Sequence, residues 1–427
     1  MYDDCKYMSI LIRNVRLDDE VTDVFIRGNR FERIGPDLDI AAERVIEGRG
    51  LAILPSFVNG HTHAAMSLLR GYADDMELHT WLTNYIWPLE ARLTEEDVSI
   101  GAKLACLEMI KSGTTFFNDM YWHWTGTARA VEDMGIRAGL SSVFIDFDDP
   151  KTAERHWQEC RELYAASQDY SGRISFMLGP HSVYAVSADS LGRIRDFAHK
   201  HDLLIHIHLS ETEKEVRDLE RKIGKRPVEY LDDLGLLGPN LVACHCLWLN
   251  EQEMELLAEK GVKVIHNPAS NMKLCSGGFS YARLRQKGVA IGLGTDGCSS
   301  NNNLDMLEEM KFASLAAKDR SGDPTLMPAS EIFTAATVTG AEIFGLEAGR
   351  IREGCLADCI LVDLGHHRLT PNHNLISNLV YAANGDCVQT TICDGKILMT
   401  DQVVDGEEEI LARARERADK LNHHRPN

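Results

Sequence analysis

The chain has 427 residues, of which 44% are hydrophobic, 7% aromatic and 26% charged, a composition typical of a globular protein in solution. This length exceeds one minimal domain and suits a barrel of about 250 residues with a smaller accessory domain. The formal net charge of −20 argues against a nucleic-acid partner, and no run approaches the roughly 18 apolar residues of a membrane span.

The cysteine content and the N-terminus both predict a cytoplasmic location. The 11 cysteines include no Cys-x-x-Cys pair, which is expected of reduced thiols that are mostly buried. The segment Met1–Lys6 is polar and lacks the apolar core of a signal peptide.

Short strands separated by turn residues are predicted near both ends of the chain. At the N-terminal end they are Ser9–Ile12, Val24–Arg27 and Arg44–Ile46. At the C-terminal end, Ala357–Val362 and Val388–Cys393 are strands, Asp394-Gly395 is a hairpin turn, and Glu407–Leu421 is a charged amphipathic helix.

The middle of the chain alternates short apolar runs with segments of helical length, such as Thr94–Ser112 and Ser187–His201. Eight strands separated by helical crossovers are typical of an α/β fold, the (β/α)8 barrel. The eight predicted strands lie near Ile53–Phe57, Thr114–Asn118, Ala138–Ile145, Ile174–Leu178, Leu204–His208, Leu241–His245, Lys263–His266 and Ala290–Gly294.

Residues that can bind metals or transfer protons follow the ends of these strands. In a barrel, strand ends that are far apart in sequence meet at one rim, where active sites lie. Three His and one Asp with an open coordination position are a catalytic metal geometry. The residues are His61 and His63 after the first strand, His181 after the fourth, His208 and Glu211 at the fifth, His245 at the sixth, and Asp296 after the eighth.

Each residue also has a structural interpretation. His-x-His is weak evidence in a chain with 17 His, and either His206 or His208 could be a core or supporting residue. Asp296 could be a helix N-cap and Glu211 a solvated first-turn carboxylate. His266 suits a turn or supporting role better than a ligand role, and the cysteines beside His245 suit barrel packing. The coincidence of so many such residues at strand ends favours a site.

Several motifs together resemble the amidohydrolase superfamily, and most closely the methylthioadenosine/S-adenosylhomocysteine deaminases. They run through nearly the whole predicted barrel: PSFVNGHTHAAMSLLRGYADD, WPLEARLTEED, SGTTFFNDMY, GPHSVY, HIHLSETEKEV, HNPASNMKL and LGTDGCSSNNNLDML.

The resemblance implies a hydrolase barrel over residues 57–355. It also implies a small β-sandwich formed by residues 1–56 and 356–427, with the terminal helix. A homo-oligomer acting on a small nucleoside is expected. No Lys in Ile174–Leu178 could be carbamylated to bridge two metals, so the site should hold one divalent ion, with Zn²⁺ preferred to Fe²⁺ or Mn²⁺.

The family's functional residues carry over by motif position. The resemblance makes Glu211 the proton shuttle to the purine ring and His245 the residue that orients the attacking water, with Asp296 also catalytic. Glu90 and His181, with Glu211 and Asp296, become substrate contacts. The metal ligands are His61, His63, His208 and Asp296.

The implied activity is hydrolytic deamination of adenosine-like nucleosides: 5′-methylthioadenosine, S-adenosylhomocysteine, adenosine or 5′-deoxyadenosine. The alternatives are an aminohydrolase of a guanine-like, pterin or triazine ring, and an inactive scaffold, which would be expected to lack some of these residues. Family members acting on S-adenosylhomocysteine place two Arg against its carboxylate. Here Ser142 stands at the first position, and Arg155 lies one residue from the second.

Overall fold

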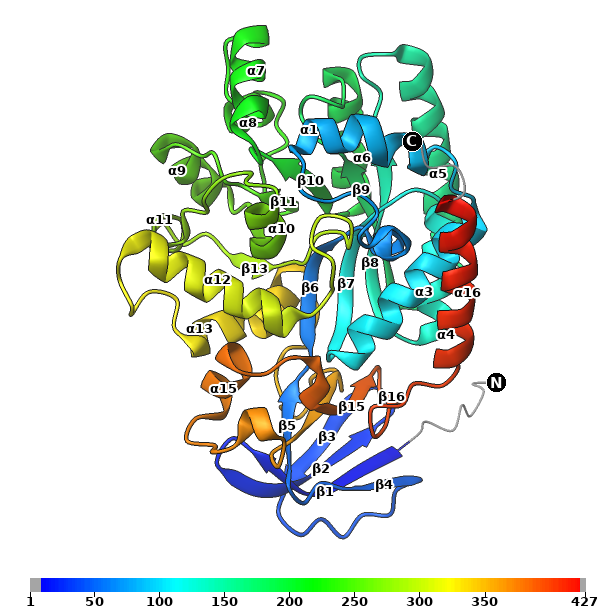
Figure 1. The fold of residues 1–427 in the computed structure, drawn as a ribbon, viewed down its shortest axis with the longest axis vertical. Coiled ribbons are helices and arrows are strands. Elements are labelled where there is room, and N and C mark those ends of the chain that lie inside the picture. Colours follow the sequence, from blue (N-terminus) through cyan, green and yellow to red (C-terminus); the bar gives the residue numbers. More distant parts are fainter. Residues whose placement is uncertain (1–8, 423–427) are drawn as a thin grey trace.

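The computed structural model describes residues 9–422, and its barrel consists of eight parallel strands hydrogen-bonded in sequence order (Figure 1). These strands are short, and most of them are buried along their whole length, as expected of a parallel sheet covered by helices. They are β6 (Phe57–Thr62), β7 (Thr114–Met120), β8 (Arg137–Phe144), β9 (Ile174–Pro180), β10 (Ile205–Leu209), β11 (Leu241–His245), β12 (Lys263–His266) and β13 (Ile291–Leu293).

Side chains join the two ends of this sheet and nearly close the barrel. Asn59 Nδ2 donates to Thr295 Oγ1 at 2.7 Å, and its Oδ1 accepts the Thr295 amide hydrogen at 3.0 Å. One residue later, the Asp296 amide donates to the His61 carbonyl at 2.9 Å. The predicted (β/α)8 fold is therefore confirmed, and its closing seam lies beside two of the candidate site residues.

Helices follow the barrel strands and lie around them (Figure 1). Their starts follow from local sequence: Thr94 Oγ1 accepts from the Asp97 amide at 3.2 Å, and Asp97 Oδ2 accepts from the Thr94 amide at 2.9 Å. These helices are α3 (Glu95–Lys111), α4 (Trp124–Met134), α5 (Pro150–Ser167), α6 (Ala188–His201), α7 (Glu213–Ile223), α8 (Pro227–Asp233), α9 (Glu251–Lys260), α10 (Pro268–Lys273), α11 (Tyr281–Gln286) and α12 (Met306–Ser321).

Further helical segments occur between β6 and α3 and after α12, and all but the last of them are short. The first group contributes several residues to the candidate site. It comprises a 3₁₀ turn (Ala64–Leu69), α1 (Leu78–Trp81), a π turn (Leu82–Ile86) and α2 (Trp87–Glu90). The second comprises α13 (Ala329–Thr334), a π turn (Ala335–Thr339), α14 (Gly340–Ile343), 3₁₀ turns (His367–Leu369 and Gly385–Cys387), α15 (Leu375–Tyr381) and α16 (Glu407–Asn422).

The two chain ends form a second, mixed sheet of eight strands below the barrel (Figure 1). β14 and β5 pair antiparallel at its centre, with Ile360 opposite Leu54, and so join the C-terminal part of the chain to the N-terminal part. The strands are β1 (Ser9–Leu17), β2 (Glu20–Arg27), β3 (Arg30–Gly35), β4 (Arg44–Glu47), β5 (Leu51–Pro55), β14 (Cys359–Asp363), β15 (Val388–Cys393) and β16 (Lys396–Met399).

The predicted first barrel strand, Ile53–Phe57, was placed wrongly. Leu51–Pro55 belongs to the mixed sheet, and the barrel begins at Phe57. Apolar residues lie on both sides of Ser56, from Leu51 to Leu54 and at Phe57 and Val58, so hydrophobic pattern alone does not show that the chain changes sheets there. The predicted hairpin at Asp394-Gly395 is confirmed, since Cys393 pairs with Lys396 and both turn residues have positive φ, 53° and 69°.

The proposed boundaries at residues 56 and 355 stay a prediction, and residues 1–8 and 423–427 of the end segments lie outside the described residues. A buried ion pair connects the barrel to the mixed sheet: Arg137 Nε lies 2.7 Å from Asp358 Oδ2. Within residues 9–422, no helix is both long and apolar enough to cross a membrane.

Candidate metal centre and active-site cleft

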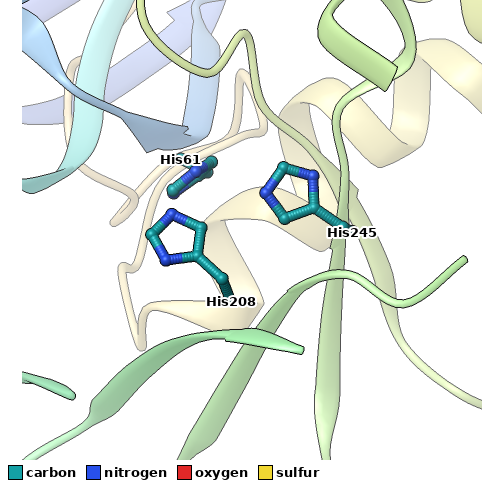
Figure 2. Close-up of side chains that lie close together, drawn as sticks. All are labelled: His61, His208 and His245. Atoms are coloured by element: carbon teal, nitrogen blue, oxygen red, sulfur yellow. The ribbon is translucent and has the colours of Figure 1, made fainter. Parts of the chain in front are cut away.

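The residues predicted to bind a metal meet at the carboxyl ends of the barrel strands. His61 lies in β6, His63 directly follows it, His208 lies in β10, and Asp296 follows β13. Asp296 Oδ1 lies 3.4 Å from His61 Nε2 and 3.3 Å from His63 Nε2, and His208 Nε2 lies 3.3 Å from His63 Nε2. Figure 2 shows His61 and His208 directed towards each other, with His245 from β11 beside them.

Hydrogen bonds at the opposite ring nitrogens fix which nitrogen of each histidine is free. His63 Nδ1 lies 2.7 Å from the Met120 carbonyl, and His208 Nδ1 lies 2.8 Å from the His181 carbonyl. A carbonyl only accepts hydrogen bonds, so both Nδ1 atoms carry hydrogen, and in the neutral rings both Nε2 atoms present a lone pair. The two lone pairs lie beside the Asp296 carboxylate.

His206 likewise determines which ring nitrogen of His61 carries hydrogen. Its Nδ1 lies 3.3 Å from Ser141 Oγ, and its Nε2 lies 2.9 Å from His61 Nδ1 and 3.1 Å from Cys244 Sγ. When His206 Nε2 accepts from His61 Nδ1–H, His61 Nε2 is left with its lone pair. That atom is buried and makes no hydrogen bond with any residue from 9 to 422. His206 therefore lies behind His61, and His208 lies at the convergence point.

Burial keeps the imidazoles of His61 and His208 neutral. Desolvation lowers the pKa of His61 to about 4 and that of His208 well below the ordinary value of 6.5. Burial alone would raise the pKa of Asp296, but the adjacent His61 and His63 hold it well below 3.8. Neutral imidazoles and an ionised carboxylate are the protonation states that bind a cation.

This donor set fits a divalent metal. Three imidazole Nε2 atoms and a carboxylate oxygen converge, and each histidine has its Nδ1 hydrogen-bonded from behind, as is usual for metal-binding histidines. The buried, unpartnered Nε2 of His61 would otherwise be an uncompensated polar atom. Within residues 9–422, the barrel strand β9 contains no Lys that could bridge a second ion.

Glu211 and His245 adjoin this centre. Glu211 Oε2 lies 4.0 Å from His245 Nε2, and its Oε1 accepts from Ser276 Oγ at 3.3 Å. Burial raises the pKa of Glu211. Burial alone would lower the pKa of His245, but Glu211 and Asp296 raise it. His245 Nδ1 lies 2.8 Å from Asn271 Oδ1, which orients the ring.

A cleft of about 690 Å³ opens above these groups and includes Glu90 and His181 in its lining. Burial raises the pKa of Glu90 to about 7 and lowers that of His181 to about 3. Polar groups at the base and aromatic or apolar side chains on the walls are typical of a pocket for a small, flat ligand. The walls include Trp81, Trp87, Tyr121, Trp122, Val143 and Ile145.

The cleft continues past Trp87 and Trp122 into a second, more open one of about 1230 Å³, where Arg155 is exposed beside Phe147. No described carboxylate lies within ion-pairing distance of Arg155. Ser142 lines neither cleft and instead interacts with the Cys160 thiol. Val143 and Ile145, which lie close to Ser142 in the sequence, line the first cleft instead. The effects expected of Ser142 and Arg155 on a substrate carboxylate stay predictions.

Sequence reasoning missed several residues that support the site. Asp119 Oδ1 accepts from Thr62 Oγ1 at 2.9 Å and from the Ala64 amide at 2.7 Å, which holds the turn carrying His63. Ser270 Oγ donates to Asp296 Oδ2 at 2.7 Å. Asp119 is the penultimate residue of β7, so the strand-end criterion could have found it, whereas Ser270 lies in α10, four residues after β12. His266 stacks on Phe279 with ring centroids 4.1 Å apart, consistent with a supporting place.

Residues 52–398 match the amidohydrolase family. The chain is 47% identical over 400 residues to 5-methylthioadenosine/S-adenosylhomocysteine deaminase 1 of Archaeoglobus fulgidus, covering 93% of this chain and 94% of that one. It is 48% identical over 390 residues to a 5′-deoxyadenosine deaminase of Methanothermobacter thermautotrophicus, covering 91% and 90%.

Solved structures agree with these relatives. An adenosine deaminase from Xanthomonas campestris with bound zinc superimposes with a TM-score of 0.92 at 34% identity, over 98% of this chain and 99% of that one. A zinc complex of atrazine chlorohydrolase from Arthrobacter aurescens shares the fold at 22% identity, with a TM-score of 0.89 over 96% and 100%. With a family match across most of its length and close relatives along nearly all of it, this chain belongs to the amidohydrolase family.

Proposed function

We propose that this protein is a metal-dependent hydrolase that deaminates adenosine-like nucleosides, replacing the 6-amino group by oxygen and releasing ammonia. The observation that carries the proposal is the convergence of three imidazole nitrogens and the Asp296 carboxylate below an aromatic-walled cleft, with a buried acid, Glu211, at its edge. The names of the relatives support the same chemistry and the same substrate class.

In this proposal, His61, His63, His208 and Asp296 hold one divalent ion, which the zinc of the Xanthomonas neighbour suggests is Zn²⁺. When bound, such an ion makes water a nucleophile at neutral pH by lowering its pKa from roughly 15.7 to about 7. One proton of the water passes through Asp296 and His245 to the departing amino group, and the proton left on the oxygen restores Glu211. The oxygen bonds to C6 of the purine, the C6–N bond breaks, and the amino group leaves as ammonia.

Glu211 delivers the proton that the purine ring nitrogen needs. Because burial raises its pKa, Glu211 holds a proton at a pH where an exposed glutamate has lost it. His181 and Glu90 line the cleft above and are proposed substrate contacts. Trp87 and Trp122 offer flat surfaces for the nucleoside. The family resemblance also predicts a homo-oligomer, which sedimentation would measure.

Ammonia release from a panel of compounds tests the proposal. We expect turnover of adenosine, 5′-deoxyadenosine or 5′-methylthioadenosine, and little with guanine, a pterin or an aminotriazine. Glu211→Gln should retain the metal but lose about 100-fold or more in turnover, the size of a general acid effect. Glu213→Gln is the matched control, because Glu213 is nearby, pairs with Arg217, and its side chain is 45% exposed.

Two results would contradict the proposal. If neither these three nucleosides nor S-adenosylhomocysteine is deaminated, the ring was misjudged, and an aminohydrolase of a guanine-like, pterin or triazine ring becomes the better assignment. If Glu211→Gln turns over as fast as the wild type, Glu211 is not the proton donor.

A further inference from the structure

The turn that presents Glu211 to the cleft is held by a second, buried carboxylate. Glu215, in the first turn of α7, accepts the Ser210 amide hydrogen at 3.0 Å with Oε1 and the Glu211 amide hydrogen at 2.8 Å with Oε2. Its side chain makes no ion pair with any residue in the described range 9–422. This residue is 7% exposed, so its two oxygens satisfy two backbone donors that water reaches poorly.

The conformation that these bonds stabilise is an uncommon one. Ser210 has φ of 50°, in the left-handed region that a residue with a side chain seldom adopts. On the other side of the turn, the Ser210 carbonyl accepts from the Leu247 and Trp248 amides at 3.1 and 3.0 Å. The chain is thus held from both sides where it leaves β10, and the Glu211 side chain points towards His245.

We propose that Glu215 is a positioning residue, which keeps Glu211 at the orientation needed for proton transfer. This inference rests on the proposed function, in which Glu211 is the proton donor. Glu215 does not line the cleft above the metal centre and only lines a neighbouring pocket that shares Trp87 and Tyr184 with it, whereas both its oxygens bond the turn, so we assign its effect to the backbone of the turn.

Glu215→Gln is the informative substitution. A carboxylate accepts with both oxygens, whereas an amide accepts with one and would turn its NH₂ towards the other backbone N–H. Because misplacing a reacting group by about 1 Å can cost about 100-fold, we expect kcat to fall about 10-fold or more. KM should stay within about twofold, since the cleft walls are untouched.

A second variant separates a positioning effect from general damage. Glycine adopts positive φ without strain, and Ser210 Oγ makes no hydrogen bond that its removal would break. We therefore expect Ser210→Gly to recover part of the lost kcat when combined with Glu215→Gln. Glu213→Gln, on the same helical turn, is the control with kcat close to the wild type.

Hydrogen exchange at the Ser210 and Glu211 amides measures, without any substrate, how firmly Glu215 holds the turn. Both amides should exchange faster in Glu215→Gln, while the metal content stays near that of the wild type. Unchanged exchange, or unchanged kcat, would overturn the proposal, as would a loss of kcat that Ser210→Gly does not relieve. If the wild type deaminates no nucleoside, the proposed function fails, whereas the exchange result still decides whether Glu215 holds the turn.

Discussion

S-adenosylhomocysteine is expected to be a poorer substrate than 5′-methylthioadenosine or 5′-deoxyadenosine. These compounds differ at the 5′ position, where S-adenosylhomocysteine alone carries an amino-acid carboxylate. The segment in which the family places its first Arg contributes two apolar side chains, Val143 and Ile145, to the cleft wall, and Ser142 interacts with Cys160 instead. Among the described residues that line the adjoining cleft, Arg155 is the only Arg or Lys.

The expected change in kcat/KM depends on how exposed Arg155 is. A buried hydrogen bond to a charged group contributes about 1.5–3 kcal/mol, so its absence should lower kcat/KM for S-adenosylhomocysteine about 10-fold or more relative to the best uncharged substrate. An exposed ion pair contributes about 0.2–1 kcal/mol. Arg155→Ala should therefore lower kcat/KM for S-adenosylhomocysteine by less than about 5-fold and leave 5′-deoxyadenosine unaffected.

Ammonia release measured side by side for adenosine, 5′-deoxyadenosine, 5′-methylthioadenosine and S-adenosylhomocysteine is the assay. Arg161→Ala is the matched control, because Arg161 is exposed on the same helix, α5, but lines neither cleft. If S-adenosylhomocysteine has the highest kcat/KM of the four compounds, the prediction that it is the poorer substrate is wrong. A large, selective loss in Arg155→Ala would then identify Arg155 as the residue that grips the carboxylate.

Three further outcomes are expected. Protein purified without added metal should contain one equivalent of a transition metal by elemental analysis, and chelation should lower Tm and abolish activity; two equivalents would contradict the single site. Arg137→Leu should lower the free energy of unfolding, measured with denaturant, by about 3–5 kcal/mol, because it leaves the buried Asp358 without its ion-pair partner. Adding Asp358→Asn should recover part of this loss. A loss below about 1 kcal/mol would argue against a stabilising ion pair. Burial raises the pKa of Glu309 well above 4.5, so the folded protein keeps a proton that the unfolded chain releases. The free energy of unfolding of the wild type should therefore fall relative to that of Glu309→Gln as pH rises above 4.5. A difference in unfolding free energy that does not change with pH would contradict this.

The residues at the catalytic rim of the barrel could be predicted from the sequence, because the place where a strand ends depends on the local sequence. His61, His63, His208, His245 and Asp296 each follow or end an apolar run, and any barrel built from those runs brings them to one rim. The structure places all five together at that rim. Their individual roles, and those of Glu90, His181 and Glu211, stay predictions that the substitutions above would test.

Other parts of the molecule depended on contacts between distant segments. The segment from Leu51 to Thr62 is divided between two sheets because Leu51–Pro55 pairs with Cys359–Asp363, about three hundred residues later, and no local pattern encodes that partner. His206 and His208 share one face of a strand, and only the position of His61 on another strand decides which lies behind it and which beside Asp296. Local periodicity specifies strands and their ends, whereas pairing register and side-chain partners are fixed only when the barrel closes.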